Sequence, residues 1–241
     1  MSYFSKGRLM SDHTSKQFDS ELEAVRSSVL QMGGLVEEQI LRAIDCVTSG
    51  DMVAIEAVVA ADKSVNRMEV ELDERCSHII ARRQPTAGDL RMLMTVVKMI
   101  TDLERIGDEA EKIARMARMI HEANRAHLPR IELAHMAEVA VAMLRKALDA
   151  FARLDVQAAA QVVRQDLVVD DEFRAVIRQL ITFMMEDPRS ISRSIEILFI
   201  AKAIERIGDH AKNMSEYTVY MVKGRDVRHI GIDAIEREAA Q

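Results

Sequence analysis

The stretch Glu104-Arg105-Ile106-Gly107-Asp108 occurs twice in this chain, because the same five residues return 101 positions later as Glu205-Arg206-Ile207-Gly208-Asp209. Upstream, Asp51 is matched by Asp155 and Asp62 by Asp166, both at an offset of 104 residues. A chance recurrence of five consecutive residues is remote, so the chain contains an internal duplication. We therefore expect two copies of one structural unit.

Apolar residues recur at helical spacing through most of the chain. The first stripe runs from Phe18 to Val47. Gly50 and Asp51 break it, and Asp51 suits the position just before a new helix. The same spacing predicts five further helices, at about 52–83, 87–124, 131–154, 156–186 and 188–223.

Turn residues separate these predicted helices. Pro85 and Pro129 interrupt the helical pattern, Pro188 follows Asp187 as the first residue of a helix, and Gly224 suits a helix C-terminus. The predicted fold class is all-α, with two tandem homologous three-helix bundles made of six long helices. The predicted ranges are 15–126 for the first bundle, 127–224 for the second, and 225–241 for a short charged tail.

The composition argues against several classes of protein. Hydrophobic residues make up 49% of the chain, while only 9 Gly and 3 Pro are present, which favours long helices over a sandwich or a barrel. The net charge of −6 argues against nucleic acid as a partner, since phosphate contacts need a clustered basic face. Lys98 and Lys202 interrupt the most apolar runs, and the start of the chain lacks the apolar core of a secretory signal. We expect a cytoplasmic protein that can contact a membrane complex from that side.

Sulfur-containing residues are expected to serve packing. Cys46 and Cys76 fall inside helical patterns, which predicts buried thiols in a reducing compartment. The 16 methionines are expected to fill the contacts between helices, although their adaptability would also suit a surface that binds partners. This expectation covers Met92, Met94, Met99, Met184 and Met185.

Each copy of the repeated motif carries two carboxylates four residues apart, Glu104 with Asp108 and Glu205 with Asp209. Residues at this spacing share one face of a helix, where like charges repel. A solvated acidic stripe is one interpretation. The duplication and the glycine inside each pair favour another, because a mid-helix glycine costs about 1 kcal/mol and indicates a close approach, either of a packed helix or of a ligand.

Helices joined by a tight turn run antiparallel, so each acidic pair faces predictable residues of the preceding helix. This places Asp62 and Asn66 opposite the first pair, and Asp166 and Asp170 opposite the second. Carboxylate and amide oxygens favour a hard divalent ion, Mg²⁺ or Mn²⁺, or a carboxylate-bridged iron cluster. The predicted metal ligands are Glu104, Asp108, Glu205, Asp209, Asp166, Asp170, Asp62 and Asn66.

The two predicted sites are not identical. Asn66 makes the first site one charge poorer, and Glu111 in the first repeat corresponds to Lys212 in the second, so we expect the sites to differ in affinity or in the number of ions. Glu132 and His135 form a single ExxH pair, whereas a di-iron carboxylate bundle needs one on each of two helices. The chain lacks a phosphate-binding glycine loop, a nucleophile elbow and a catalytic triad signature, so no catalytic residue is predicted.

The twin motifs on twin three-helix units resemble the PhoU family. Four further stretches support the resemblance, namely Met32–Glu37, Gln84–Arg91, Met184–Asp187 and Tyr217–Gly224. The resemblance implies a negative regulator of phosphate uptake and phosphate-starvation signalling. It implies an adaptor between the ATPase subunit of the phosphate ABC transporter and a sensor histidine kinase. It also implies metal ions on the acidic motifs, from which Asn66 departs, and a homodimer.

Two other hypotheses stay open at this point. A di-metal carboxylate enzyme would need histidine ligands and an interior site, which the scattered histidines do not favour. A metal-free helical scaffold would leave the acidic faces solvated and would bind no metal specifically. It would also leave the repeated glycine without a functional role.

Overall fold

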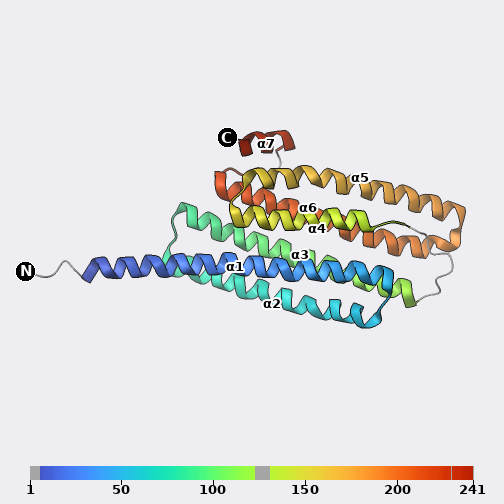
Figure 1. Ribbon diagram of the computed structural model, residues 1–241, viewed down its shortest axis with the longest axis horizontal. Helices are drawn as coiled ribbons and strands as arrows, with labels where there is room; N and C mark the ends of the chain where they lie inside the picture. Colours follow the sequence, from blue (N-terminus) through green and yellow to red (C-terminus); the bar gives the residue numbers. More distant parts are fainter. Residues whose placement is uncertain (1–5, 123–130, 229, 241) are drawn as a thin grey trace, which may run out of the picture.

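The computed structural model describes residues 6–122, 131–228 and 230–240, and every regular element in these ranges is helical (Figure 1). A short 3-10 turn, Pro188–Ser190, precedes the sixth helix. The seven α-helices are α1 (Lys6–Ser49), α2 (Met52–Arg83), α3 (Ala87–Glu122), α4 (Ala134–Arg153), α5 (Val156–Glu186), α6 (Ile191–Lys223) and α7 (Ile232–Ala240).

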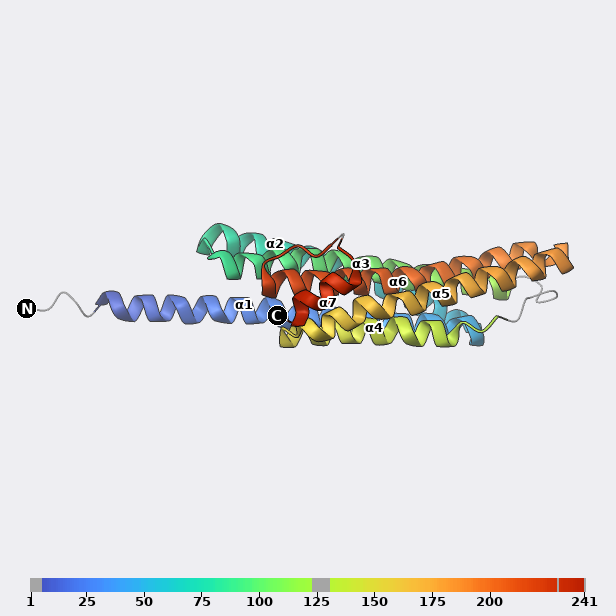
Figure 2. The same cartoon turned by 90° about the horizontal axis from the view of Figure 1, so that it is seen from above.

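Helices α1, α2 and α3 pack on one another as one bundle, and α4, α5 and α6 form a second. The main contact between the bundles joins α3 to α6, and a smaller one joins α1 to α4 (Figures 1 and 2). The predicted all-α fold of two tandem three-helix bundles is therefore confirmed. The predicted boundary between residues 126 and 127 lies outside the described residues, as do Asn124 and Pro129.

Each long helix buries an apolar stripe with steps of three and four residues. On α1 the stripe includes Val25, Val29, Met32, Val36 and Ile40, all at most 1% exposed. Burying one such side chain stabilises the fold by about 1.5–3 kcal/mol. Most buried residues of both bundles belong to one continuous core, so the two repeats pack against each other.

Three of the predicted helix ends are confirmed by their local geometry. Asp51 Oδ1 accepts from the backbone N–H groups of Val53 and Ala54 at 2.9 and 3.2 Å. Asp155 Oδ1 accepts from the N–H of Ala158 at 2.9 Å. Gly224 ends α6 at a φ of 73°, a left-handed conformation in which glycine is unstrained.

The structure differs from the sequence prediction at three helices. α1 begins at Lys6, well before Phe18, and α4 begins at Ala134 rather than at residue 131. The tail holds α7, whose Ile235 is 1% exposed and packs with Val227 against small residues of α5. Only one face of this nine-residue helix is apolar, so its stripe is too short to stand out in the sequence.

The sulfur-containing residues behave only partly as predicted. Cys46 and Cys76 are buried free thiols, as expected, and burial raises the pKa of Cys76 to about 11. Met99 is fully buried. The core assignment is wrong for Met94 and Met185, which are 44% and 80% exposed. Met185 is the penultimate residue of α5.

Contact between α1 and α4 depends on a residue without a side chain. A Cβ placed on Gly33 would lie 2.5 Å from Cδ1 of Leu148, so any larger residue there would force the Leu148 side chain to move. At the adjacent Gly34, a Cβ would meet nothing within 4 Å. Gly33 is therefore a packing residue, whereas Gly34 is free of that constraint.

We expect Gly33→Val to lower the free energy of unfolding by about 1–3 kcal/mol, because the added carbons overpack the contact with Leu148. Gly34→Ala, one residue away on the same helix, should raise it by about 0.5–1 kcal/mol, because alanine restricts the unfolded chain. Urea unfolding followed by circular dichroism measures both changes. Equal effects of the two substitutions would contradict the packing role of Gly33.

Candidate functional site

The first acidic face lies where α2 packs against α3 at Gly107. A Cβ placed on Gly107 would lie 3.3 Å from Asp62 Oδ1, 3.4 Å from Gln39 Oε1 and 3.4 Å from Val65 Cγ1. Asp62 therefore faces the repeated motif, as the antiparallel register predicts. Because Gly107 has no side chain, two side-chain oxygens can approach the backbone of α3, one from α1 and one from α2.

Three side-chain oxygens at this contact are buried without a hydrogen-bond partner: Gln39 Oε1, Asp62 Oδ1 and Asn66 Oδ1. Asn66 Nδ2 donates to Asp62 Oδ2 at 3.0 Å, while Gln39 Nε2 donates to the carbonyl oxygens of Val58 and Gly107 only at 3.5 and 3.4 Å. Gln39 is 3% and Asp62 7% exposed. An unpartnered buried polar atom costs about 1–3 kcal/mol. The contact is therefore suited to a positive or hydrogen-bond-donating group.

The carboxylates of this face disfavour one another's ionisation. Burial raises the pKa of Asp62, and the charges of Asp108 and Glu111 raise it further, while a contact with Gln39 opposes the rise. Burial also raises the pKa of Glu104, with Asp108 as the next contributor. These four carboxylates therefore interact electrostatically, and Asp62 faces the others from α2.

Arg105 provides loose compensation for these charges. Its guanidinium lies 3.5 Å from both Glu104 and Asp108, although the sequence places it off their face. The side chain is 55% exposed. Long ion pairs at this exposure contribute at most about 1 kcal/mol, so the first face keeps a surplus of negative charge.

The second acidic face repeats this arrangement at Gly208. A Cβ placed there would lie 3.7 Å from Asp166 Oδ1 and 3.7 Å from the methyl carbon of Met143. Asp166 therefore faces the second motif, as predicted. Burial raises the pKa of Asp209, and the charges of Glu205 and Asp166 raise it further.

Ammonium groups occupy this second face. Lys212 Nζ lies 2.7 Å from Asp166 Oδ2, and Lys202 Nζ lies 2.6 Å from both carboxylate oxygens of Glu205. Asp170 lies 3.8 Å from Arg174 of its own helix. Lysines therefore contact Glu205 and Asp166 at hydrogen-bond distance, whereas Arg105 contacts the first acidic pair only at 3.5 Å.

The donor atoms of the first face fit a hard divalent cation, because the unpartnered atoms there are all carboxylate or amide oxygens. Asp62, Asn66, Glu104 and Asp108 are the residues that would hold such an ion, with Gln39 as a further oxygen donor. Within the described ranges, no group of three or more His, Cys, Asp or Glu side chains is already arranged to hold a metal. Metal ligation by these residues therefore stays a prediction.

Gln39 is the member of this site that the sequence reasoning missed. A signal was present, because Gln39 lies on the buried stripe of α1, three residues after Val36 and four before Ala43. A polar side chain on such a stripe needs a partner inside the bundle. Identifying that partner required the position of α1 over the contact between α2 and α3.

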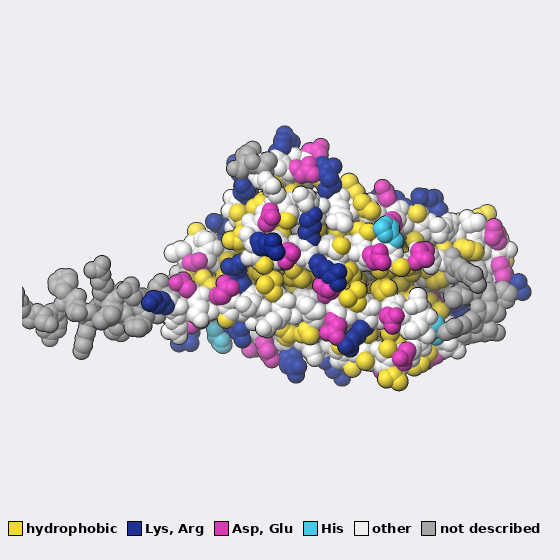
Figure 3. Space-filling view, in the orientation of Figure 1, with side chains coloured by type: hydrophobic (Ala, Val, Ile, Leu, Met, Phe, Trp, Pro, Cys, Tyr) yellow, Lys and Arg dark blue, Asp and Glu magenta, His cyan; other side chains and the backbone are white. Residues whose placement is uncertain are grey.

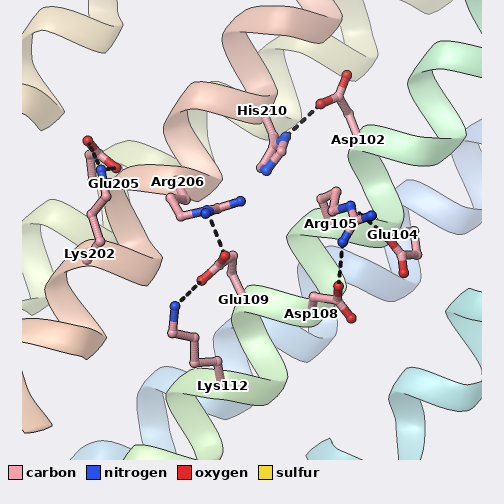
Figure 4. A network of polar contacts seen from close by, with 10 residues as sticks. All are labelled: Asp102, Glu104, Arg105, Asp108, Glu109, Lys112, Lys202, Glu205, Arg206 and His210. Carbon is pink, nitrogen blue, oxygen red and sulfur yellow. Dashed lines mark hydrogen bonds and ion pairs between the residues drawn. The ribbon is translucent and has the colours of Figure 1, made fainter.

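A second polar network joins the two repeats across the contact between α3 and α6 (Figure 4). His210 Nδ1 lies 2.6 Å from Asp102 Oδ1, and Arg206 Nε lies 2.7 Å from Glu109 Oε1. Asp102 and Glu109 are 7% and 6% exposed. His210 therefore lies at the contact between the two repeats. Arg206 points away from the second acidic pair and pairs with α3.

We expect Asp62→Asn to raise the thermal midpoint at pH 7 by about 1–3 °C. The folded state raises the pKa of this carboxyl above its ordinary 3.8, so ionisation destabilises the fold at neutral pH. The gain should shrink as the pH falls and vanish below the ordinary pKa of 3.8, where both states hold the proton. Calorimetry in the presence of a chelator measures the difference. Asp45→Asn on the exposed side of α1 is the control, and a lower midpoint for Asp62→Asn at pH 7 would contradict the prediction.

Comparison with known proteins places this architecture in a family. A family model described as the PhoU domain matches residues 29–117 and again residues 133–218. The phosphate-specific transport system accessory protein PhoU of Escherichia coli is 44% identical over 229 residues, which cover 95% of this chain and 94% of that protein. The PhoU homolog of Pseudomonas putida is 45% identical over 229 residues, covering 95% of this chain and 90% of that protein.

Solved structures agree with these relatives. PhoU from Pseudomonas aeruginosa superposes with a TM-score of 0.82 at 45% identity, covering 86% of this chain and 100% of that one. The phosphate transport system regulatory protein PhoU from Streptococcus pneumoniae gives a TM-score of 0.81 at 27% identity, covering 88% of this chain and 99% of that one. The chain therefore belongs to the PhoU family and carries the PhoU domain twice in tandem.

Proposed function

We propose that this protein is a negative regulator of phosphate uptake and phosphate-starvation signalling. The observation that carries the proposal is the match over 95% of the chain to the Escherichia coli protein, whose name describes an accessory protein of phosphate-specific transport. Members of the PhoU family are regulatory accessory proteins and not enzymes. Family membership therefore favours regulation over the di-metal enzyme.

In this proposal the chain is a cytoplasmic adaptor, as a homodimer, between the ATPase subunit of the phosphate ABC transporter and a sensor histidine kinase. Large apolar side chains near the turn between α5 and α6 support a role in protein contacts, since Met185 is 80% and Ile191 41% exposed. Within the described residues, no helix has the length and apolar character needed to cross a membrane.

The surface charge supports protein partners over nucleic acid. On the face drawn in Figure 3, acidic and basic side chains are interspersed and are not separated by sign. The net charge of the chain is −6. Binding to nucleic acid relies on a clustered basic surface, which neither observation supports.

We also propose that the acidic faces take part in regulation by binding divalent metal ions, of which Mg²⁺, Mn²⁺ and Fe²⁺ suit oxygen ligands. A bound ion would neutralise the facing carboxylates and tie the second helix of a repeat to its third. The support is the pair of facing acidic clusters and the unpartnered oxygens of Asp62, Asn66 and Gln39. If the chain binds no metal, the hypothesis of a metal-free helical scaffold is favoured instead.

A strain that lacks this gene should express a phosphate-starvation reporter in phosphate-rich medium, because the restraint on signalling is lost. The wild-type gene should restore repression. A gene carrying Glu104→Ala and Asp108→Ala should restore it only in part, because the acidic face is neutralised. Lys16→Ala is the control and should restore repression fully, with all proteins compared at equal level by immunoblot.

Unchanged repression in the deleted strain would contradict the regulatory role. Full complementation by the Glu104→Ala, Asp108→Ala variant would leave that role standing and would remove the acidic face from the mechanism.

A further inference from the structure

One pair of equivalent positions is charged in the first repeat and apolar in the second. The offsets of 104 and 101 residues align Glu56 with Ala160 and Arg118 with Val219. In the first repeat the two side chains form an ion pair and are 67% and 31% exposed. In the second repeat Ala160 is 3% and Val219 0% exposed. The second repeat therefore has an apolar surface at a place where the first repeat is polar and solvated, and such a surface favours a cover.

Helix α7 is that cover, and it lies along the outer side of α5 (Figure 1). Ile235 and Ala239 share one face of α7 and are 1% and 9% exposed. They belong to a small core with Ala160, Val163 and Val219, which is separate from the main core of the two bundles. The tail thus buries an apolar surface that the two bundles alone would leave open.

Charged side chains flank the contact on both sides of α7. Arg164 of α5 lies 2.7 Å from Glu236 and 3.3 Å from Asp233. Arg225 lies 2.6 Å from Glu238. The carboxylates all come from α7, and the guanidinium groups come from the rest of the chain. The covered surface therefore recognises a helix with one apolar face and an acidic flank.

The contacts that hold α7 are few and exposed. The helix has nine residues, and isolated helices shorter than about 12–15 residues are marginal in water, so α7 depends on its packing. The side chains of Arg164 and Arg225 are 52% and 71% exposed, where ion pairs are screened by solvent. Because its core is separate from the main one, α7 can leave without opening the two bundles.

The apolar stripe of α5 continues past the part that is buried. Val156, Ala160, Val163 and Leu167 follow one another at steps of four, three and four residues, so they share one face. The first three are at most 7% exposed, whereas Leu167 is 48% exposed. The stripe therefore offers a longer helix more apolar contact than α7 uses.

We propose that the surface under α7 is a docking site for a helix of a partner protein, and that α7 occupies it as an internal competitor. The helix that fits has the chemistry of α7, with apolar residues spaced as Ile235 and Ala239 are and carboxylates that reach Arg164. Binding of such a helix in place of α7 is a helix-in-groove interaction. The test in cells rests on the regulatory role proposed above, whereas the binding test does not.

The binding test uses the full chain and a fluorescent peptide with the sequence of residues 231–241 as the probe. The wild type should bind the peptide weakly, because its own α7 competes at a high effective concentration. Ile235→Asp should bind it about tenfold more tightly or better, because this change loosens α7 and leaves the surface intact. Adding Ala160→Glu to Ile235→Asp should abolish the gain. Fluorescence anisotropy measures all three affinities.

Glutamate at position 160 is the residue that the first repeat carries at the equivalent position, so the fold accommodates it. Glu56→Ala is the matched control in the first repeat, and it should leave peptide binding unchanged. Circular dichroism establishes that each variant is folded.

The reporter strain separates docking from a purely structural role of α7. Ile235→Asp and Ala160→Glu both loosen α7, but only Ile235→Asp leaves a surface that a partner can use. Ile235→Asp should therefore repress the reporter more strongly than the wild type at intermediate phosphate. Ala160→Glu should repress it less strongly. A cover that serves only stability would shift both variants in the same direction.

Absence of peptide binding by Ile235→Asp would overturn the docking site, and so would reporter shifts of the same sign in both variants. Loss of a dimer on Ile235→Asp, measured by analytical ultracentrifugation, would show that α7 is exchanged between two copies and would overturn a separate partner. Unchanged repression in the deleted strain would instead remove the regulatory role, and the peptide result would still decide the docking site.

Discussion

Carboxylates gathered on a partly buried helix face are the constraint on which the rest of this structure depends. Asp62 and Asp209 illustrate it, since burial and neighbouring acids both raise their pKa values. A fold that keeps such groups must supply positive charge or hydrogen-bond donors, from its own side chains or from outside. The duplication presents the same problem twice. The second repeat solves it with lysines, and the first leaves buried oxygens of Gln39 and Asp62 unpartnered.

Helix α3 carries both the acidic face of the first repeat and the contact between the repeats. Asp108 belongs to the acidic face, while the next residue, Glu109, pairs with Arg206 of α6 (Figure 4). Consecutive residues point about 100° apart around a helix, so one turn of α3 can face α2 with one side chain and contact α6 with the next. Asp102 and His210 add a second link one to two turns away. A change of charge on the first acidic face therefore acts on α3, the helix that also joins the two bundles.

Much of the fold could be predicted because its signals are local. Asp51 and Asp155 cap helices through their own neighbours, and a tight turn fixes which residues of the next helix Asp62 and Asp166 face. The partners of long side chains were not predictable, because they depend on how three helices sit together. Lys212 was seen as a difference between the repeats, but its ion pair with Asp166 was not, and the role of Gln39 required α1 to be placed over the site.

The most direct test of the central claim is the position of a bound ion. Crystals of the full chain grown with Mn²⁺ would show it as a peak of anomalous scattering. The account predicts a peak at an acidic face, where Asp62 faces Gly107 or where Asp166 faces Gly208. No peak beside either glycine would contradict it.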